Sequence, residues 1–132
     1  MNNQATMTEI FGEVISVYSR AQAIKDGVLV DMEQGDFQEV TKQHFSIPVA
    51  VTASVFTMIE KAVENKKHCN DFKGVWHDLC HMSKIYRGGK TNYLFPCIIT
   101  GVGRKRNHTF KAVYGHGDNG ELTLTIMLPN ED

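Results

Sequence analysis

The chain has few cysteines and no long hydrophobic run. Its three cysteines, Cys69, Cys80 and Cys97, are odd in number and irregularly spaced, so we expect reduced thiols rather than a disulfide framework. No apolar stretch approaches the about 18 residues that span a bilayer, and residues 1–8 lack the basic and apolar layout of a signal peptide. The sequence therefore predicts a cytoplasmic protein with no membrane association.

The composition is that of an ordinary globular protein. Of the 132 residues, 42% are hydrophobic and 22% are charged, values that do not fit a disordered chain. A chain of this length buries enough surface to fold without disulfides or metals, but has no room for a second full core. We expect a single domain over residues 1–132.

Charge is unevenly distributed although the net charge is only -1. Residues 1–40 have a net charge of -5, residues 41–111 of +8 and residues 112–132 of -4, and the stretch 84–111 contains seven bases and no acid. This separation indicates either a face for an anionic partner or a solvated surface balanced by the acidic ends.

The first third of the chain has weak structural signals. Apolar residues alternate over 10–18, which is typical of a strand or an extended arm. Ser19 and Gln22 form a capping-box pattern, which predicts a short helix from Arg20 to Lys25 or Asp26 that ends at Gly27. Residues 28–30 follow as a short buried strand, and residues 31–45 are expected to be an irregular polar connection.

Two helices and three strands are predicted in the remainder. Thr52 and Asp71 are N-cap candidates for helices that reach Val63 or Glu64 and about Tyr86, each with one apolar stripe. From residue 93 the apolar period changes to two, which predicts strands over 93–102, 109–114 and 122–128 joined by glycine-rich turns. The expected fold class is α+β, an antiparallel three-stranded meander packed against two amphipathic helices, with an N-terminal arm and short helix.

One cluster of metal-binding residue types lies on and before the second long helix. His77 and His81 are four residues apart and project from one helix face, while His68, Cys69 and Cys80 could add ligands. The spacing matches no standard zinc signature, and Asp78 stands where zinc peptidases have a glutamate. We expect these residues to be structural and predict no metal and no cofactor.

Two sets of residues are candidates for binding an anion. Tyr18, Arg20 and Asp26 lie around the start of the short helix, where free N–H groups and an arginine favour a phosphate. Arg104, Lys105 and Arg106 lie in the turn between two predicted strands. No serine, histidine and aspartate order or nucleophile elbow suggests a hydrolase, so no catalytic residues are predicted.

Three segments resemble a known family. Residues 18–31, residues 110–121 and residues 125–129 are similar to small uncharacterised proteins carried by bacterial plasmids and phages, and with the second long helix the likeness covers about two thirds of the chain. His77 and His81 stand where relatives have apolar residues, which argues further against a zinc site. The resemblance implies no assigned activity and no functional residues, and it implies a bacterial host.

These observations lead to three functional hypotheses. The first is a non-enzymatic accessory protein of a mobile element that binds a host macromolecule, for which a host protein, such as a component of a host defence system, is the candidate. The second is an enzyme or sequestering domain for a small phosphorylated ligand, held by Tyr18, Arg20, Asp26 and the basic turn. The third is a nucleic-acid binder, for which three bases predict weak affinity unless cations from Lys84, Arg87 and Lys111 join them. The sequence predicts no oligomeric state.

Overall fold

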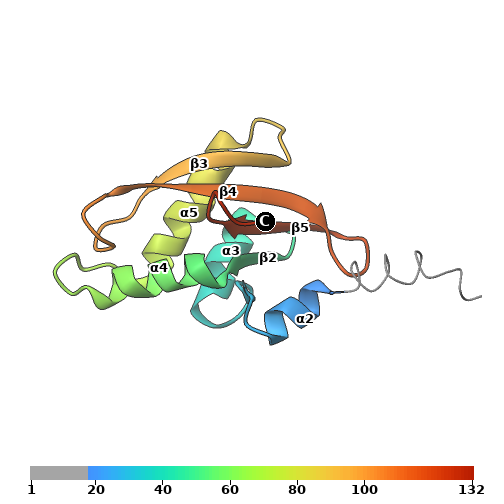
Figure 1. Cartoon of the computed structure of the whole chain (residues 1–132), viewed down its shortest axis with the longest axis horizontal. Helices are drawn as coiled ribbons and strands as arrows, with labels where there is room; N and C mark the ends of the chain where they lie inside the picture. Colours follow the sequence, from blue (N-terminus) through green and yellow to red (C-terminus); the bar gives the residue numbers. More distant parts are fainter. Residues whose placement is uncertain (1–17) are drawn as a thin grey trace, which may run out of the picture.

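The protein has an α+β fold in which helices pack against a five-stranded mixed sheet (Figure 1). The computed structural model describes residues 18–132, so the predicted strand or arm over 10–18 lies outside the described residues except for Tyr18. Within 18–132, no helix is both long and apolar enough to cross a membrane. The elements in chain order are α2 (Arg20–Lys25), β1 (Leu29–Asp31), the 3-10 helix η2 (Gly35–Phe37), α3 (Gln38–His44), β2 (Val49–Thr52), α4 (Ala53–Glu64), α5 (Phe72–Arg87), β3 (Asn92–Ile98), β4 (Asn107–His116) and β5 (Leu122–Met127).

The predicted helix boundaries are confirmed by their caps. The side chains of Ser19, Thr52 and Asp71 accept hydrogen bonds from backbone N–H groups in the first turns of α2, α4 and α5. Helix α5 ends at Gly88 in the left-handed conformation, with φ of 50°. The second half of the predicted capping box is wrong, because the Gln22 side chain donates through Nε2 to Asp26 Oδ1 at 2.8 Å and does not accept from the backbone N–H of Ser19.

The C-terminal meander is confirmed and forms the larger part of the sheet. Strand β4 pairs antiparallel with β3 and with β5, and the strand order across the sheet is β1-β2-β5-β4-β3. Strand β2 extends the meander by pairing parallel to β5, with Val49 opposite Leu124. Because β2 and β5 are far apart in the chain, no local sequence pattern predicts their pairing.

The core lies between the sheet and helices α4 and α5. Alternate residues of the strands and the apolar stripes of both helices meet there, as the two periodicities require. Trp76, Leu79, Phe95 and Phe110 are fully buried, together with Ile59 of α4. Within the hairpin, strand β3 packs against α5.

The predicted irregular connection over 31–45 is wrong. This segment forms η2 and α3, which pack against α5. The buried Thr41 hydroxyl holds it in place: it donates to the carbonyl oxygen of Met32 at 2.6 Å and accepts from Trp76 Nε1 at 2.8 Å. The sequence signal was weak because only Val40 and Thr41 of α3 are buried and its N-cap makes no side-chain hydrogen bond.

Strand β3 is an edge strand that is poorly suited to pairing with another strand. Hydrogen bonds from Ile99 N to Arg106 O and from Tyr114 N to Thr91 O place the main-chain groups of odd-numbered β3 residues toward β4. Pro96 therefore occupies an outward position, where it lacks the N–H that an added strand would use.

Candidate functional site

The polar side chains of the first predicted set of site residues, around α2, form hydrogen bonds within the protein. The Arg20 guanidinium donates to Thr125 Oγ1 and to the carbonyl oxygen of Leu124, both at 2.8 Å. The Tyr18 hydroxyl donates to Asp26 Oδ2 at 3.0 Å. In this structure Arg20 joins α2 to strand β5.

The N–H groups at the start of α2 are bound by a carboxylate that the sequence did not indicate. Arg20 N donates to Asp118 Oδ1 at 2.7 Å and Ala21 N donates to Asp118 Oδ2 at 3.0 Å. Asp118 lies in the β4–β5 turn, about a hundred residues away in the chain, so no local signal could have found it. It takes the position that a bound phosphate would use at this helix end.

The surroundings of Arg20 are acidic. Burial lowers the pKa of its guanidinium, and the carboxylates of Asp31, Asp118, Glu121 and Glu33 act in the opposite direction. These acids come from the N-terminal and C-terminal segments that the sequence marks as negative. We call them the acidic end of the molecule.

The second predicted set does not join the first. Arg104, Lys105 and Arg106 lie in the β3–β4 turn, whereas Asp118 lies in the turn at the other end of β4. The ten residues of β4 separate the two turns by about 30 Å at the usual rise per residue. The predicted ligand-binding residues therefore lie in two separate regions of the surface and do not line one site.

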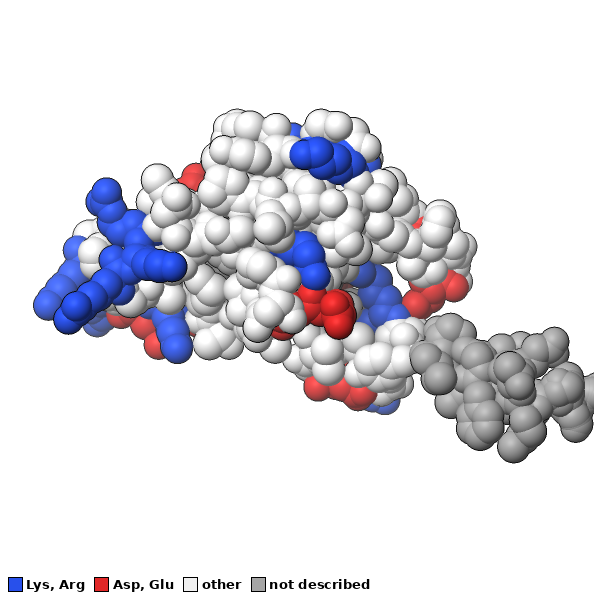
Figure 2. Space-filling model, turned by 45° about the horizontal axis from the view of Figure 1, so that its top comes forward, with Lys and Arg blue, Asp and Glu red and all other residues white. Residues whose placement is uncertain are grey.

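Three lysines of α4 and the α4–α5 connection lie at the same end of the molecule as the basic turn. Asn65 Nδ2 donates to the carbonyl oxygen of Gly101 at 3.3 Å, and Asn70 Nδ2 donates to that of Thr100 at 2.9 Å, which ties the α4–α5 connection to the β3–β4 turn. Figure 2 shows Lys and Arg side chains gathered at this end of the molecule. We define the basic end as six exposed residues: Lys61, Lys66, Lys67, Arg104, Lys105 and Arg106.

A shallow groove separates the two halves of the basic end. One wall is formed by Lys61, Glu64 and Asn65 and the other by residues 101–103, around a volume of about 630 Å³. Gly101 has φ of 90°, and a Cβ atom there would lie 3.2 Å from Asn65 Cβ. The close approach of the two basic segments therefore depends on a glycine at this position.

The cations that the sequence suggested as additions lie elsewhere. The Arg87 guanidinium stacks over the Tyr114 ring at 3.7 Å, and the Lys111 ammonium donates to the carbonyl oxygen of Glu131. Lys84 and Arg87 line a different pocket with Tyr114. Lys84, Arg87 and Lys111 therefore do not join the basic turn, which was the condition that the sequence set for strong nucleic-acid binding there.

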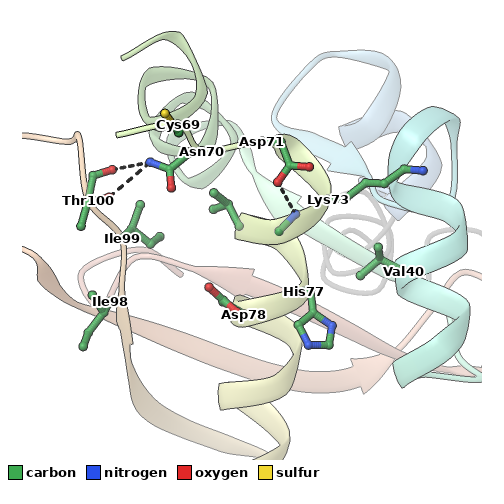
Figure 3. A pocket seen from close by; sticks show the side chains of 12 residues that line it. Val40, Cys69, Asn70, Asp71, Lys73, His77, Asp78, Ile98, Ile99 and Thr100 are labelled. Atoms are coloured by element: carbon green, nitrogen blue, oxygen red, sulfur yellow. Dashed lines mark hydrogen bonds between the residues drawn. The ribbon is translucent and has the colours of Figure 1, made fainter. Parts of the chain in front are cut away.

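A second pocket, of about 530 Å³, lies between the start of α5 and the end of β3 (Figure 3). Its polar lining includes Asp71, Lys73, His77 and Asp78, and Thr100 connects it to the basic turn. The Asp71 carboxylate caps α5 by accepting from Gly74 N at 3.1 Å. The remaining charged and titratable lining groups, Lys73, His77 and Asp78, differ in charge.

The histidines and cysteines of the predicted cluster are only partly together. His77 and His81 stack with ring centroids 6.0 Å apart, and His77 Nδ1 lies 2.8 Å from His44 Nε2 of α3, a neighbour that the sequence did not indicate. Burial lowers the pKa of His44 to about 4, with smaller contributions from Lys84, His77 and His81. Within residues 18–132, no group of three His, Cys, Asp or Glu residues has the arrangement to hold a metal.

The two buried cysteines have weakly acidic thiols. Burial raises the pKa of Cys80, and it raises that of Cys97 to about 12, with the Asp78 carboxylate as a smaller cause. Both thiols stay protonated at neutral pH, so neither provides the thiolate that a nucleophile or metal ligand requires. Cys69 is exposed in the α4–α5 connection.

Comparison with known proteins gives one match. No curated protein and no solved structure matches the chain. The model of a family of unknown function, DUF6573, matches residues 1–74, which is more than half of the chain. The matched segment includes α2, α4 and Lys61, Lys66 and Lys67 of the basic end. The chain therefore belongs to this family of unknown function.

Proposed function

We propose that the protein acts by binding and not by catalysis, as an accessory protein of a phage or plasmid. Its target is a macromolecule of the bacterial host, of which a component of a defence system is the leading candidate. The origin from a mobile element rests on the resemblance of residues 18–31, 110–121 and 125–129 to such proteins. The binding surface is the basic end.

One observation supports this choice of surface. Within residues 18–132, the acids around Arg20 and the six bases of the basic end lie at different ends of β4, so these acids do not neutralise the basic end, where Figure 2 shows a cluster of Lys and Arg side chains. At a separation of about 30 Å, several times the Debye length of about 8 Å at physiological salt, the acids around Arg20 hardly reduce the field at the basic turn. An exposed cluster of six cations, with Glu64 as the acid beside Lys61, favours an anionic partner.

The alternative is that a small phosphorylated ligand binds at the start of α2. The structure adds a requirement that the sequence did not indicate. A phosphate that binds Arg20 N and Ala21 N must first displace the Asp118 carboxylate. NMR titration with inorganic phosphate tests this directly, because only such displacement moves both amide signals. We favour the basic end because it needs no rearrangement.

The proposal is tested by plasmid establishment in bacterial cells that carry a restriction system. Three variants of equal charge change are compared with the wild type. The hairpin variant changes Arg104, Lys105 and Arg106 to Gln, the lysine variant changes Lys61, Lys66 and Lys67 to Gln, and the control variant changes the exposed Lys25, Lys42 and Lys90 to Gln.

We expect the wild type and the control variant to raise the number of transformants, and the hairpin and lysine variants to lose this effect. Equal activity of all four proteins would contradict the proposed binding surface. An unchanged number of transformants in every strain, with all four proteins expressed, would contradict a role against restriction.

A further inference from the structure

We infer that the basic end binds the phosphate backbone of nucleic acid, and that the backbone lies along the groove between its two segments. This inference rests on the proposed function, since it concerns the same surface, but it assigns nucleic acid as the macromolecule bound there in place of a protein of a defence system. It differs from a site built on the β3–β4 turn alone, because Lys61, Lys66 and Lys67 contribute half of the cations.

The amount of positive charge is the first support. Three bases in a turn give weak binding that fades at physiological salt, whereas six cations that converge from two segments meet the requirement for a phosphate-binding surface. All six side chains are exposed, and Glu64 is the acid that shares the groove with Lys61. The local net charge therefore remains strongly positive.

The shape of the groove is the second support. Its hairpin wall consists of Gly101, Val102 and Gly103, two of which have no side chain and adopt positive φ. A wall of this kind lets a phosphate approach main-chain N–H groups while flanking lysines and arginines provide charge. Positively charged grooves of this kind follow a nucleic-acid backbone in many single-strand binding proteins.

The side chains that are missing from this surface argue against an acidic protein as the partner. Residues 60–68 and 100–106 contain no Phe, Tyr or Trp, and among the described residues Val102 is the one apolar residue that lines the groove. Stable protein interfaces depend on buried aromatic or apolar anchors, whereas a polyanion can be held by charge. The same lack of aromatic rings means that bases are not stacked, so binding depends on phosphate contacts, which carry no sequence information.

The test is fluorescence anisotropy of the full chain with a labelled 20-nucleotide DNA, as a single strand and as a duplex, over a range of salt concentrations. Six contacts give a slope of log K against log salt of about -5 for duplex and about -4 for single strands. The hairpin and lysine variants should each halve the slope and weaken binding at least about tenfold at 100 mM salt. The control variant should bind as the wild type does, and labelled polyglutamate should not bind.

Three results would overturn the inference. Binding that survives in both the hairpin and the lysine variants would place the site elsewhere. Loss in the hairpin variant alone would reduce the site to the turn. Absence of binding to both single-stranded and duplex DNA at 50 mM salt, with polyglutamate bound, would identify an acidic protein as the partner. The plasmid assay separates this last case from a failure of the proposed function, because the hairpin and lysine variants would still lose activity there.

Discussion

Replacing Gly101 with alanine tests whether the close approach of the two basic segments matters. The added Cβ would lie 3.2 Å from Asn65 Cβ, 3.4 Å from His68 Cδ2 and 3.5 Å from the carbonyl oxygen of Ala62. Asn65 Cβ is fixed by its own backbone, so the two segments must move apart by a few tenths of an ångström. The backbone strain at φ of 90° adds to this contact.

Gly103 provides a matched control in the same turn. Its φ is 73°, but a Cβ atom there would have no neighbour within 4 Å. Both substitutions incur about 1–2 kcal/mol of left-handed strain, partly offset by about 0.4–1 kcal/mol from the lower entropy of the unfolded chain. The close contact adds about 1 kcal/mol or more to Gly101→Ala alone.

The expected loss of unfolding free energy is therefore about 2 kcal/mol for Gly101→Ala and less than about 1 kcal/mol for Gly103→Ala. In a chain of this length the first corresponds to a fall in melting temperature of about 8 °C. Urea unfolding measures the free energy of unfolding, and thermal scans measure the melting temperature. At a temperature where Gly101→Ala is still folded, this variant should also bind DNA more weakly than the wild type does. Equal stability and equal binding of the two variants would refute the role of this contact.

Two further predictions concern the packing of α3. Thr41→Val keeps the shape of the side chain but leaves Trp76 Nε1 and the carbonyl oxygen of Met32 without the Thr41 hydroxyl as a partner. Urea unfolding should therefore show a loss of about 2–4 kcal/mol in the free energy of unfolding. The control Thr57→Val, at an exposed position, should lose less than about 0.5 kcal/mol. The folded-state pKa of His44 is lowered to about 4, so the neutral form is favoured on folding and stability is lost as pH falls from about 6.5 toward 4. Discounted for partial exposure, this loss is about 1–2 kcal/mol, and it should be absent in His44→Gln; an identical pH profile of that variant and the wild type would disprove the assignment.

Local signals predicted the elements that depend on neighbouring residues. Ser19, Thr52 and Asp71 cap helices because the hydrogen bond that fixes each cap spans three residues. The alternation over β3, β4 and β5 likewise showed which strand residues face the core, and it gave the correct antiparallel meander. Helix α3 escaped detection because its stability comes from Thr41 and its bonds to distant groups, not from an apolar stripe.

The sequence predicted only one of the two segments of the candidate site, because the second segment is placed by contacts between distant residues. Arg104, Lys105 and Arg106 are adjacent in sequence, so their common position needed no tertiary information. Lys66 and Lys67 are brought to the same end by the hydrogen bonds of Asn65 and Asn70 to the β3–β4 turn, which join residues 36 and 30 positions apart. Charge blocks along the chain showed that bases and acids segregate, but only the length of β4 shows that they occupy opposite ends.

The most direct test of the two-segment basic end is chemical-shift mapping of the 15N-labelled full chain during titration with a 12-nucleotide DNA at 50 mM salt. We predict that amide signals of residues 65–68 and of residues 101–106 move together and saturate at one DNA concentration, while those of Arg20, Ala21 and Asp118 stay in place. Movement confined to residues 101–106, or movement at Arg20 and Ala21, would contradict a nucleic-acid surface built from both segments.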